Sequence, residues 1–223
     1  MKIQLLFFLI LTSFKVASST PQIPDKLIYQ GSEYEWNGYS PAVDLFKEKK
    51  FKPPKEALET TANYGIFLYT YSIIDNCLYL TDVKILISVE KDGVPQLDEK
   101  SVFKLYFPDN DKVLMKNYSG LQVIGYGDQI KRKTKGRIFF YNKDYFVFDI
   151  NEGILNKTLD LNFKKFQKLK REQFEKLKNS SDFNKIKNDN RQNLIYYNEF
   201  RDEKFSMEEY LEMYILDNLK HLR

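Results

Sequence analysis

Cysteine, histidine and tryptophan each occur only once in this chain of 223 residues. The single cysteine, Cys77, excludes an intramolecular disulfide and a cysteine-based zinc site, so packing must supply the stability of the fold. The single histidine, His221, lies near the end of the chain, where we expect it to be solvated. Neither a Ser-His or Cys-His nucleophile pair nor a histidine-based metal site is therefore expected. The sequence assigns no catalytic residue, no cofactor and no metal ligand.

An excess of charge of one sign is also missing. The 35 Lys and Arg residues nearly balance the 31 Asp and Glu residues, and the net charge is +4. Removal of Lys2 and Lys15 with an N-terminal leader would lower the charge further. Proteins that bind nucleic acid neutralise many phosphates with an excess of cations. The composition therefore indicates no nucleic-acid partner.

Long apolar runs are missing too, apart from a short one at the N-terminus. Lys2 precedes an apolar run over residues 3–11, and small residues follow at 16–19. The run is about half of the roughly 20 residues that a membrane-spanning helix needs. A charged start, a short apolar run and a small-residue exit are typical of a signal peptide. Residues 1–19 are therefore predicted to be a removed signal peptide, which leaves an exported protein, periplasmic or extracellular, without a transmembrane segment.

Residues 20–156 are predicted to form an antiparallel β-rich domain, sandwich-like or barrel-like. β-branched and aromatic residues recur there with a two-residue period, as on pleated strands with one buried face. The expected strands are residues 26–30, 33–36, 64–73, 77–80, 83–90, 102–107, 121–126, 137–141 and 145–150. Cys77 lies on one of them and is expected to be buried. The clearest hairpin turn is predicted at residues 142–144, where Asn, Lys and Asp separate two aromatic strands.

Residues 157–223 are predicted to form a helical segment that packs on the β domain. Apolar residues recur there at helical spacings, at Leu159, Phe163, Phe166, Phe174 and Leu177. This pattern predicts an amphipathic helix over residues 159–178. A last helix is expected over residues 206–222, where Ser206 and Glu209 fit a capping box. The fold class is therefore α+β, a β-rich domain followed by a helical C-terminal segment.

Several segments resemble the opening of a group of uncharacterised exported bacterial proteins. They are residues 25–34, 39–46, 60–66 and 78–83, the last reading Leu78-Tyr-Leu-Thr-Asp-Val83. In that group a strand pair precedes a proline-marked turn, a Thr-Ala-rich strand start and a Leu-Tyr-Leu-x-Asp-Val/Ile strand. Residues 117–120, Asn-Tyr-Ser-Gly, are similar to a later Trp-x-Ser-Gly element. The resemblance implies a secreted β-rich domain of bacterial source, and it implies no activity because the function of the group is unknown.

Two features of the sequence define a candidate binding surface. The stretch 157–191 is rich in cations, and a row of tyrosines lies on predicted strands, where aromatic rings can anchor a partner. The surface comprises Lys164, Lys165, Lys168, Lys170, Tyr69, Tyr71 and Tyr141. The partner would be another protein or an envelope polyanion. The favoured alternative is that the lysines pair within the chain with acidic residues of the last helix, Glu208, Glu209 and Glu212.

Three functions agree with these observations, and the sequence indicates no oligomeric state. The favoured function is an exported, non-enzymatic binding protein of unknown partner. The second is a carboxylate-dependent glycan hydrolase of the envelope or extracellular space, because two carboxylates suffice for glycoside hydrolysis. Its candidate carboxylates are Glu33, Glu35, Asp82, Glu90 and Asp149. The third is an envelope-associated structural protein that the basic helix holds in place.

Overall fold

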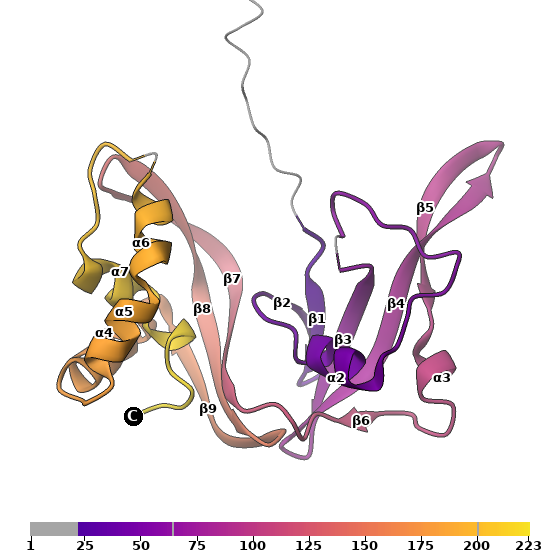
Figure 1. The fold of residues 1–223 in the computed structure, drawn as a ribbon, viewed down its shortest axis with the longest axis horizontal. Helices are drawn as coiled ribbons and strands as arrows, with labels where there is room; N and C mark the ends of the chain where they lie inside the picture. The colour runs from indigo at the N-terminus through magenta and orange to yellow at the C-terminus, as the bar shows by residue number, and fades with distance from the viewer. Residues whose placement is uncertain (1–21, 64, 200) are drawn as a thin grey trace, which may run out of the picture.

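The computed structural model describes residues 22–63, 65–199 and 201–223, and within them nine strands form one sheet (Figure 1). The strands are β1 (Asp25–Tyr29), β2 (Ser32–Trp36), β3 (Phe67–Ile74), β4 (Cys77–Lys91), β5 (Val94–Ser101), β6 (Val113–Leu114), β7 (Gly120–Thr134), β8 (Arg137–Asn151) and β9 (Ile154–Asn162). Their order is β2-β1-β3-β4-β9-β8-β7, and both β5 and β6 pair with β4. The predicted signal peptide, residues 1–19, lies outside the described residues.

The helices lie mostly in the C-terminal part of the chain, which confirms the predicted α+β class. They are α2 (Pro41–Lys49), α3 (Phe103–Tyr106), α4 (Phe163–Lys178), α5 (Phe183–Asp189), α6 (Arg191–Asn198), α7 (Met207–Met213) and the 3₁₀ helix η1 (Ile215–Asp217). Helices α4 to α7 and η1 form a helical lobe beside the long strands β7 and β8 (Figure 1). In the part of the chain that the structure describes, no helix is long and apolar enough to cross a membrane.

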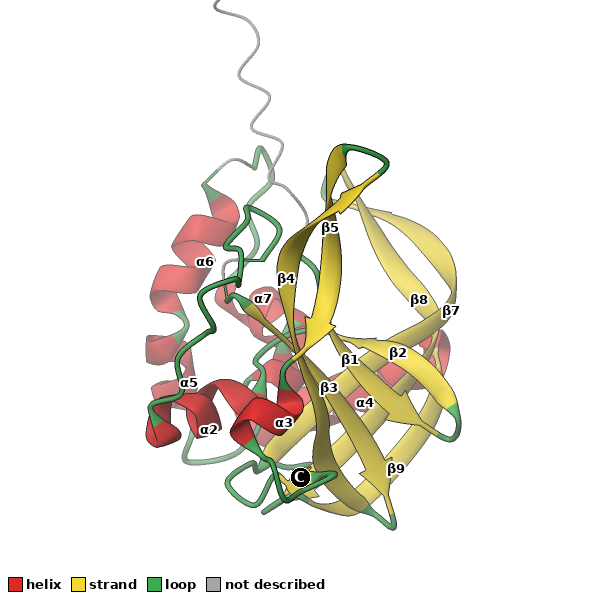
Figure 2. Ribbon diagram, turned by 90° about the vertical axis from the view of Figure 1, so that its right-hand side faces the viewer, coloured by secondary structure: helices red, strands yellow, loops and turns green. Residues whose placement is uncertain are grey.

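The sheet curls until its two end strands, β2 and β7, lie side by side (Figure 2). Gln122 on β7 donates from Nε2 to the backbone oxygen of Asn37 at 3.1 Å. The rings of Tyr34 and Tyr126 pack edge to face with centroids 5.8 Å apart. The β unit is therefore barrel-like, as expected, but it is mixed, because β1 and β3 run parallel. Strand β2 returns the chain to the start of β1, and the segment containing α2 leads from there to β3.

The hairpins turn at sites where both central residues have positive φ, as in type I′ turns. These sites are Gln30–Gly31, Asp75–Asn76, Asp92–Gly93, Lys135–Gly136 and Glu152–Gly153. The predicted hairpin at residues 142–144 is wrong, because β8 runs unbroken through them. Asp144 pairs with Tyr126 on β7 and with Asn162 on β9, and this pairing on both sides keeps the polar segment extended.

Strand β8 contributes side chains to two hydrophobic cores, one on each of its faces. Phe146 and Phe148 belong to the core inside the barrel-like sheet. Tyr145 and Val147 belong to a second core with residues of α4, α7 and η1. Successive side chains of a strand point to opposite faces, so one strand can serve both cores. Every residue from 145 to 150 is buried as a result.

The predicted boundary of the helical segment at residue 157 is too early. Strand β9 continues to Asn162, and α4 begins at Phe163, where the Asn162 side chain accepts a hydrogen bond from the Lys165 N–H at 3.0 Å. Leu159, which the helical pattern included, lies on β9 and packs against the same core as the helices. A two-residue period and a helical period both fit such a residue, so the sequence pattern extended the helix across the strand.

Other local predictions had mixed outcomes. The capping box of Ser206 and Glu209 is confirmed at the start of α7. However, α7 ends at Met213 instead of reaching residue 222, and residues 103–106 form the short helix α3 in place of a predicted strand. Cys77 is half-buried at the start of β4 instead of fully buried. It pairs in register with Ile154 of β9, at the junction of the two halves of the sheet.

Gly153 is expected to be a sensitive position at this junction. Its φ is +77°, and a Cβ there would lie 2.8 Å from the backbone oxygen of Met115. Gly93 is a matched control, because its φ is +75° but nothing lies within 4 Å of an added Cβ. Both alanine variants carry the strain of positive φ, but only Gly153→Ala also forces a contact. We expect Gly153→Ala to lower the free energy of unfolding by about 2 kcal/mol more than Gly93→Ala, measured by urea denaturation.

Candidate functional site

Two tyrosines of the predicted binding surface lie in the barrel core. Tyr69 and Tyr71 are 4% and 0% exposed, so this part of the prediction is wrong. The Tyr71 hydroxyl lies 2.5 Å from Ser40 Oγ and accepts a hydrogen bond from the Ala42 N–H at 2.9 Å. These contacts hold the start of α2 against β3. Strand periodicity alone did not distinguish the inner from the outer face of the sheet.

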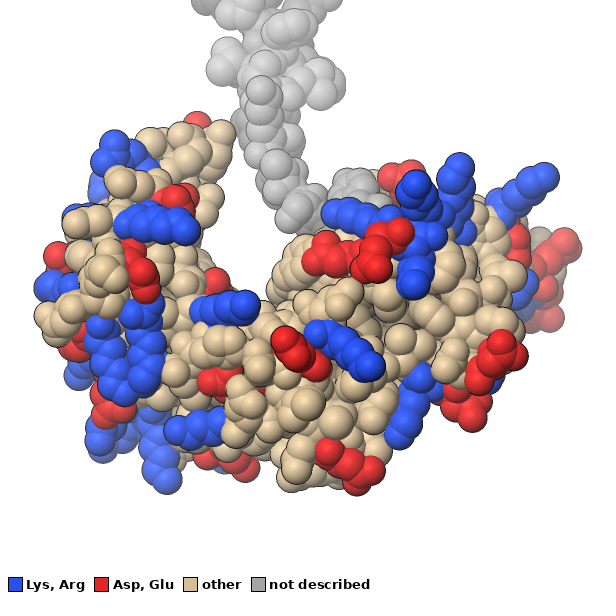
Figure 3. Space-filling model, turned by 60° about the horizontal axis from the view of Figure 1, so that its bottom comes forward, with Lys and Arg blue, Asp and Glu red and all other residues tan. Residues whose placement is uncertain are grey.

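The lysines of α4 divide into an exposed set and one buried residue. Lys164, Lys165 and Lys168 are exposed, in a lobe where cationic side chains gather (Figure 3). Lys170 is only 8% exposed and lies on the buried stripe of α4 with Phe166 and Phe174. The prediction of four equivalent surface lysines is therefore wrong for Lys170.

The favoured pairing of the four predicted surface lysines with the acidic residues of the last helix is wrong, because these acids pair with other cations of the chain. The ion pairs are Glu208 with Lys178 at 3.0 Å, Glu209 with Lys135 at 2.8 Å and Glu212 with Arg171 at 3.7 Å. In the described part of the chain, Lys170 has neither a hydrogen bond nor an ion pair. Its ammonium lies 5.7 Å from the centre of the Phe166 ring, a weak cation–π contact. A buried cation is thus left without an anion although several carboxylates are near.

Lys170 separates two adjoining hollows between the sheet and the helical lobe. The aromatic hollow has a volume of about 260 Å³ and is lined by Val123, Phe139, Tyr141, Tyr145, Phe166, Lys170, Met213, Tyr214, Leu216 and Asp217. The polar hollow has a volume of about 230 Å³ and is lined by Thr134, Lys135, Tyr141, Gln167, Lys170, Phe205, Glu209, Glu212 and Met213. Tyr141, Lys170 and Met213 line both. Two members of the predicted surface, Tyr141 and Lys170, are therefore brought together here.

The charges at these hollows are poorly solvated. Burial lowers the pKa of the Lys170 ammonium, and the nearby carboxylates of Asp217 and Glu212 raise it again in part. Desolvation also raises the pKa of the Asp217 carboxyl, and the Lys170 charge opposes this rise. The ammonium therefore has a desolvation cost that no contact in the described residues fully offsets.

A second donor without a partner lies one helical turn from Lys170. The Nε2 atom of Gln167 is buried and makes no hydrogen bond within the described residues. Residues three apart on a helix share a face, so Gln167 and Lys170 both present donors to the polar hollow. Burial raises the pKa of the Tyr141 phenol, which keeps this hydroxyl protonated between the hollows. A polar group that accepts hydrogen bonds would satisfy these donors.

The wall of the aromatic hollow is rigid and apolar. Tyr145 and Phe166 stack with centroids 3.9 Å apart and an interplanar angle of 7°. The Tyr145 hydroxyl accepts a hydrogen bond from the Asn142 N–H at 2.8 Å, which fixes the ring. Both rings, each 7% exposed, form part of the apolar lining of this hollow. The two hollows together suit a ligand with an anionic head and an apolar body.

Three of the candidate carboxylates of a hydrolase are engaged in contacts within the described structure. Glu33 pairs with Lys26 at 3.1 Å on the β1–β2 hairpin, and Asp82 on β4 accepts a hydrogen bond from the Ser101 hydroxyl at 2.6 Å. Asp149 on β8 is occupied by the C-terminal residues, since it accepts from the Leu222 N–H at 3.0 Å and lies 2.6 Å from Nδ1 of His221. Each of these three carboxylates has a structural contact of its own.

His221 is therefore held by a contact that the sequence did not predict. Its expected solvation is only partly right, because its side chain is 35% exposed and its Nδ1 contacts Asp149, of which 9% is exposed. The next residues are fixed as well, since Gln173 Oε1 accepts from the Arg223 N–H at 2.7 Å and Arg223 donates to Asp182 at 2.7 Å. The contacts of residues 221–223 account for two buried polar side chains, Asp149 and Gln173.

Comparison with known proteins adds no functional assignment. Neither a protein family, nor a curated protein, nor a solved structure matches the chain. A proposal for the function must therefore be based on the geometry around Lys170.

Proposed function

We propose that this protein is an exported, non-enzymatic binding protein whose ligand is a small carboxylate with an apolar body. The observation that carries the proposal is the buried ammonium of Lys170, which faces two hollows without an ion pair in the described residues. The signal-peptide pattern of residues 1–19 supports export. A binding site that stores an unsatisfied charge is stabilised when a ligand supplies the opposite charge.

A monoanion fits this site better than a phosphate. Carboxylates of Glu209, Glu212 and Asp217 line the hollows near Lys170, and they would repel a dianion. Phosphate sites present several donors or an arginine fork, whereas the one ammonium here without an ion pair in the described residues is that of Lys170, since Lys135 pairs with Glu209. The apolar body would lie against the stacked rings of Tyr145 and Phe166. The ligand class is therefore a carboxylic acid with an aliphatic or aromatic chain.

The direct test compares each acid with its neutral amide. Octanoate and 4-phenylbutyrate should bind in isothermal titration calorimetry, and octanamide and 4-phenylbutyramide should bind at least about tenfold more weakly, because a charge-assisted hydrogen bond contributes about 1.5–3 kcal/mol. Binding of the acids should weaken as the pH rises through the lowered pKa of Lys170, which lies below the usual 10.5. Equal affinity for acids and amides would contradict the proposal.

The hydrolase remains a second candidate with less support. It needs two carboxylates that face one substrate, and Glu33, Asp82 and Asp149 are each already engaged in a contact within the chain. The binding proposal therefore takes precedence over glycan hydrolysis.

A further inference from the structure

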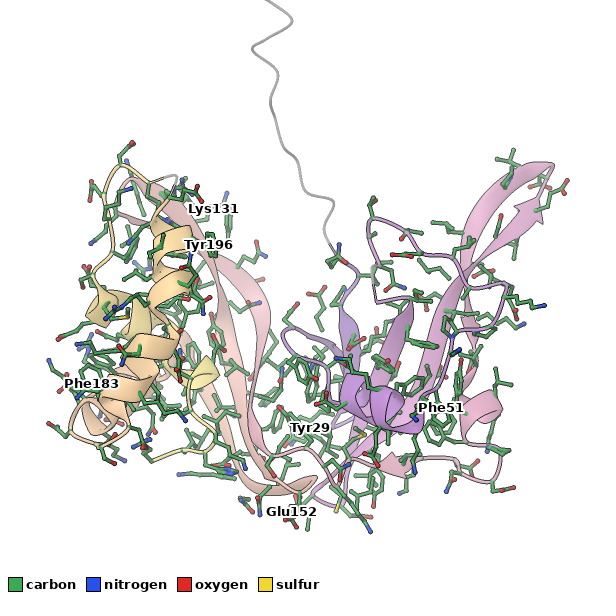
Figure 4. The ribbon with its side chains drawn as sticks, in the orientation of Figure 1. Tyr29, Phe51, Lys131, Glu152, Phe183 and Tyr196 are labelled. Atoms are coloured by element: carbon green, nitrogen blue, oxygen red, sulfur yellow. The ribbon has the colours of Figure 1, made fainter. Side chains whose placement is uncertain are left out.

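The far end of the β7–β8 ribbon has one face that packs on nothing in the described structure. Lys131 on β7 pairs in register with Phe140 on β8, and Lys133 pairs with Ile138. Alternation along the strands places these four side chains on one face. The neighbouring residues point the other way, where Phe139 packs edge to face on Phe205 of the helical lobe at 6.5 Å. Lys131 lies at the end of the ribbon remote from Tyr29 in the barrel core (Figure 4).

This ribbon face combines exposed apolar groups with unpaired cations. Ile138 and Phe140 are 59% and 58% exposed, which is unusual for large apolar side chains at adjacent pairs of one ribbon. Lys131 and Lys133 are exposed, and in the described structure neither has a hydrogen bond or an ion pair. The Lys131 ammonium lies 5.6 Å from the centre of the Phe140 ring. Two cations and two apolar side chains are therefore exposed to solvent on the same face of the ribbon.

The charge of the ribbon end has one sign. Residues 130–141 contain five Lys or Arg residues and no Asp or Glu. Lys135 in the turn contacts Glu209 of the helical lobe at 2.8 Å, so the cations of the free face are Lys131 and Lys133. A surface with fixed negative charge is complementary to this face.

We propose that the ribbon face of Lys131, Lys133, Ile138 and Phe140 docks on the surface of an anionic lipid bilayer. The lysines contact the anionic headgroups, and the two apolar side chains enter the boundary between headgroups and acyl chains. A soluble polyanion would use the cations alone and leave Ile138 and Phe140 in water, so the bilayer is the partner that uses all four side chains. The inference is independent of the carboxylate site, because it involves none of the residues that line the two hollows.

The test measures sedimentation of the protein with vesicles of phosphatidylcholine alone and of phosphatidylcholine with phosphatidylglycerol. We expect binding only to the anionic vesicles, and Lys131→Glu/Lys133→Glu should weaken it by about tenfold or more, since each cation near such a surface contributes about 1 kcal/mol. The matched control is Lys164→Glu/Lys165→Glu on α4, which changes the net charge equally at another exposed site. The control should retain binding, and an equal loss in both variants would overturn the proposal.

A second measurement tests insertion of the apolar side chains. The sequence has a single tryptophan, Trp36, which is 2% exposed in the barrel core. A Phe140→Trp variant therefore adds a fluorophore whose emission should shift to the blue with anionic vesicles but not with polyglutamate. Ile138→Ser/Phe140→Ser should also weaken vesicle binding. Full binding by this serine variant, or equal binding of the protein to polyglutamate, would assign the face to a soluble polyanion and overturn the bilayer proposal.

Discussion

Replacing Lys170 with methionine is expected to raise the melting temperature and to abolish carboxylate binding. Methionine fills a similar volume on the buried stripe of α4 and removes a desolvated ammonium that has no ion pair in the described structure. We expect a gain of about 1–2 kcal/mol, or roughly 2–8 °C for a chain of this size. The loss of affinity for octanoate should be about tenfold or more, since the charge-assisted contact is removed. Calorimetry measures both quantities.

The control for this experiment is Lys164→Met, which removes an exposed lysine from the same helix. It should change neither stability nor affinity, because exposed charges contribute little. A Lys170→Met variant that is less stable than the native protein would show that the ammonium stabilises the fold, and the proposed site would then be wrong.

The pH dependence of stability gives a separate check on Lys170. Its pKa in the folded protein is below 10.5, so between these two values the unfolded chain holds more protons than the folded one. Raising the pH through this interval therefore increases the contribution of this group to the free energy of unfolding. The native protein should gain stability relative to Lys170→Met as the pH rises through the interval, measured by urea denaturation.

Replacing Asp149 with alanine is expected to lower the free energy of unfolding by about 3 kcal/mol. The carboxylate accepts from the Leu222 N–H and contacts His221, and both contacts lie in a largely buried site. Their removal leaves buried polar groups without partners, which costs about 1–3 kcal/mol for each. We expect a fall in melting temperature of roughly 6–12 °C by circular dichroism.

His221→Ala is the matched comparison for Asp149→Ala. It removes the imidazole contact but leaves the bond from the Leu222 N–H to Asp149 in place. We expect it to cost about 1 kcal/mol, clearly less than Asp149→Ala. Equal costs would mean that the backbone contact of Leu222 contributes nothing and that the contribution of Asp149 comes from His221.

The spacing of apolar residues on α4 already indicates that residue 170 is buried. Phe166 and Phe174 define the buried stripe of α4, and position 170 is one turn from each of them. The helical period therefore places residue 170 on the buried face. A lysine is ordinarily exposed, because its charge is costly to bury. Residue type therefore predicts an exposed Lys170, whereas the helical spacing predicts a buried one, and the spacing is correct. This buried lysine is the residue that the two hollows share at the proposed binding site.

Local sequence patterns do not predict which residues of other elements lie near Lys170. Tyr141 lies on β8 and meets Lys170 only because the helical lobe packs on one face of that strand. Sequence spacing predicts which residues share a face of one element, and it does not predict which elements meet. The same limit applies to Tyr69 and Tyr71, since alternation predicts that they share one face of the sheet but does not predict which face of a curled sheet is inside.

Strand β8 couples the barrel-like sheet to the helical lobe, because it contributes side chains to the core of each. Phe146 and Phe148 cannot leave the barrel core without moving Tyr145 and Val147, which alternate with them and fill the core under the helices. Because loss of either core would free the strand on which the other depends, we expect the described part of the chain to unfold in one cooperative transition. A cut between residues 156 and 157 would divide β9, which pairs with β8, so we expect that neither fragment folds on its own.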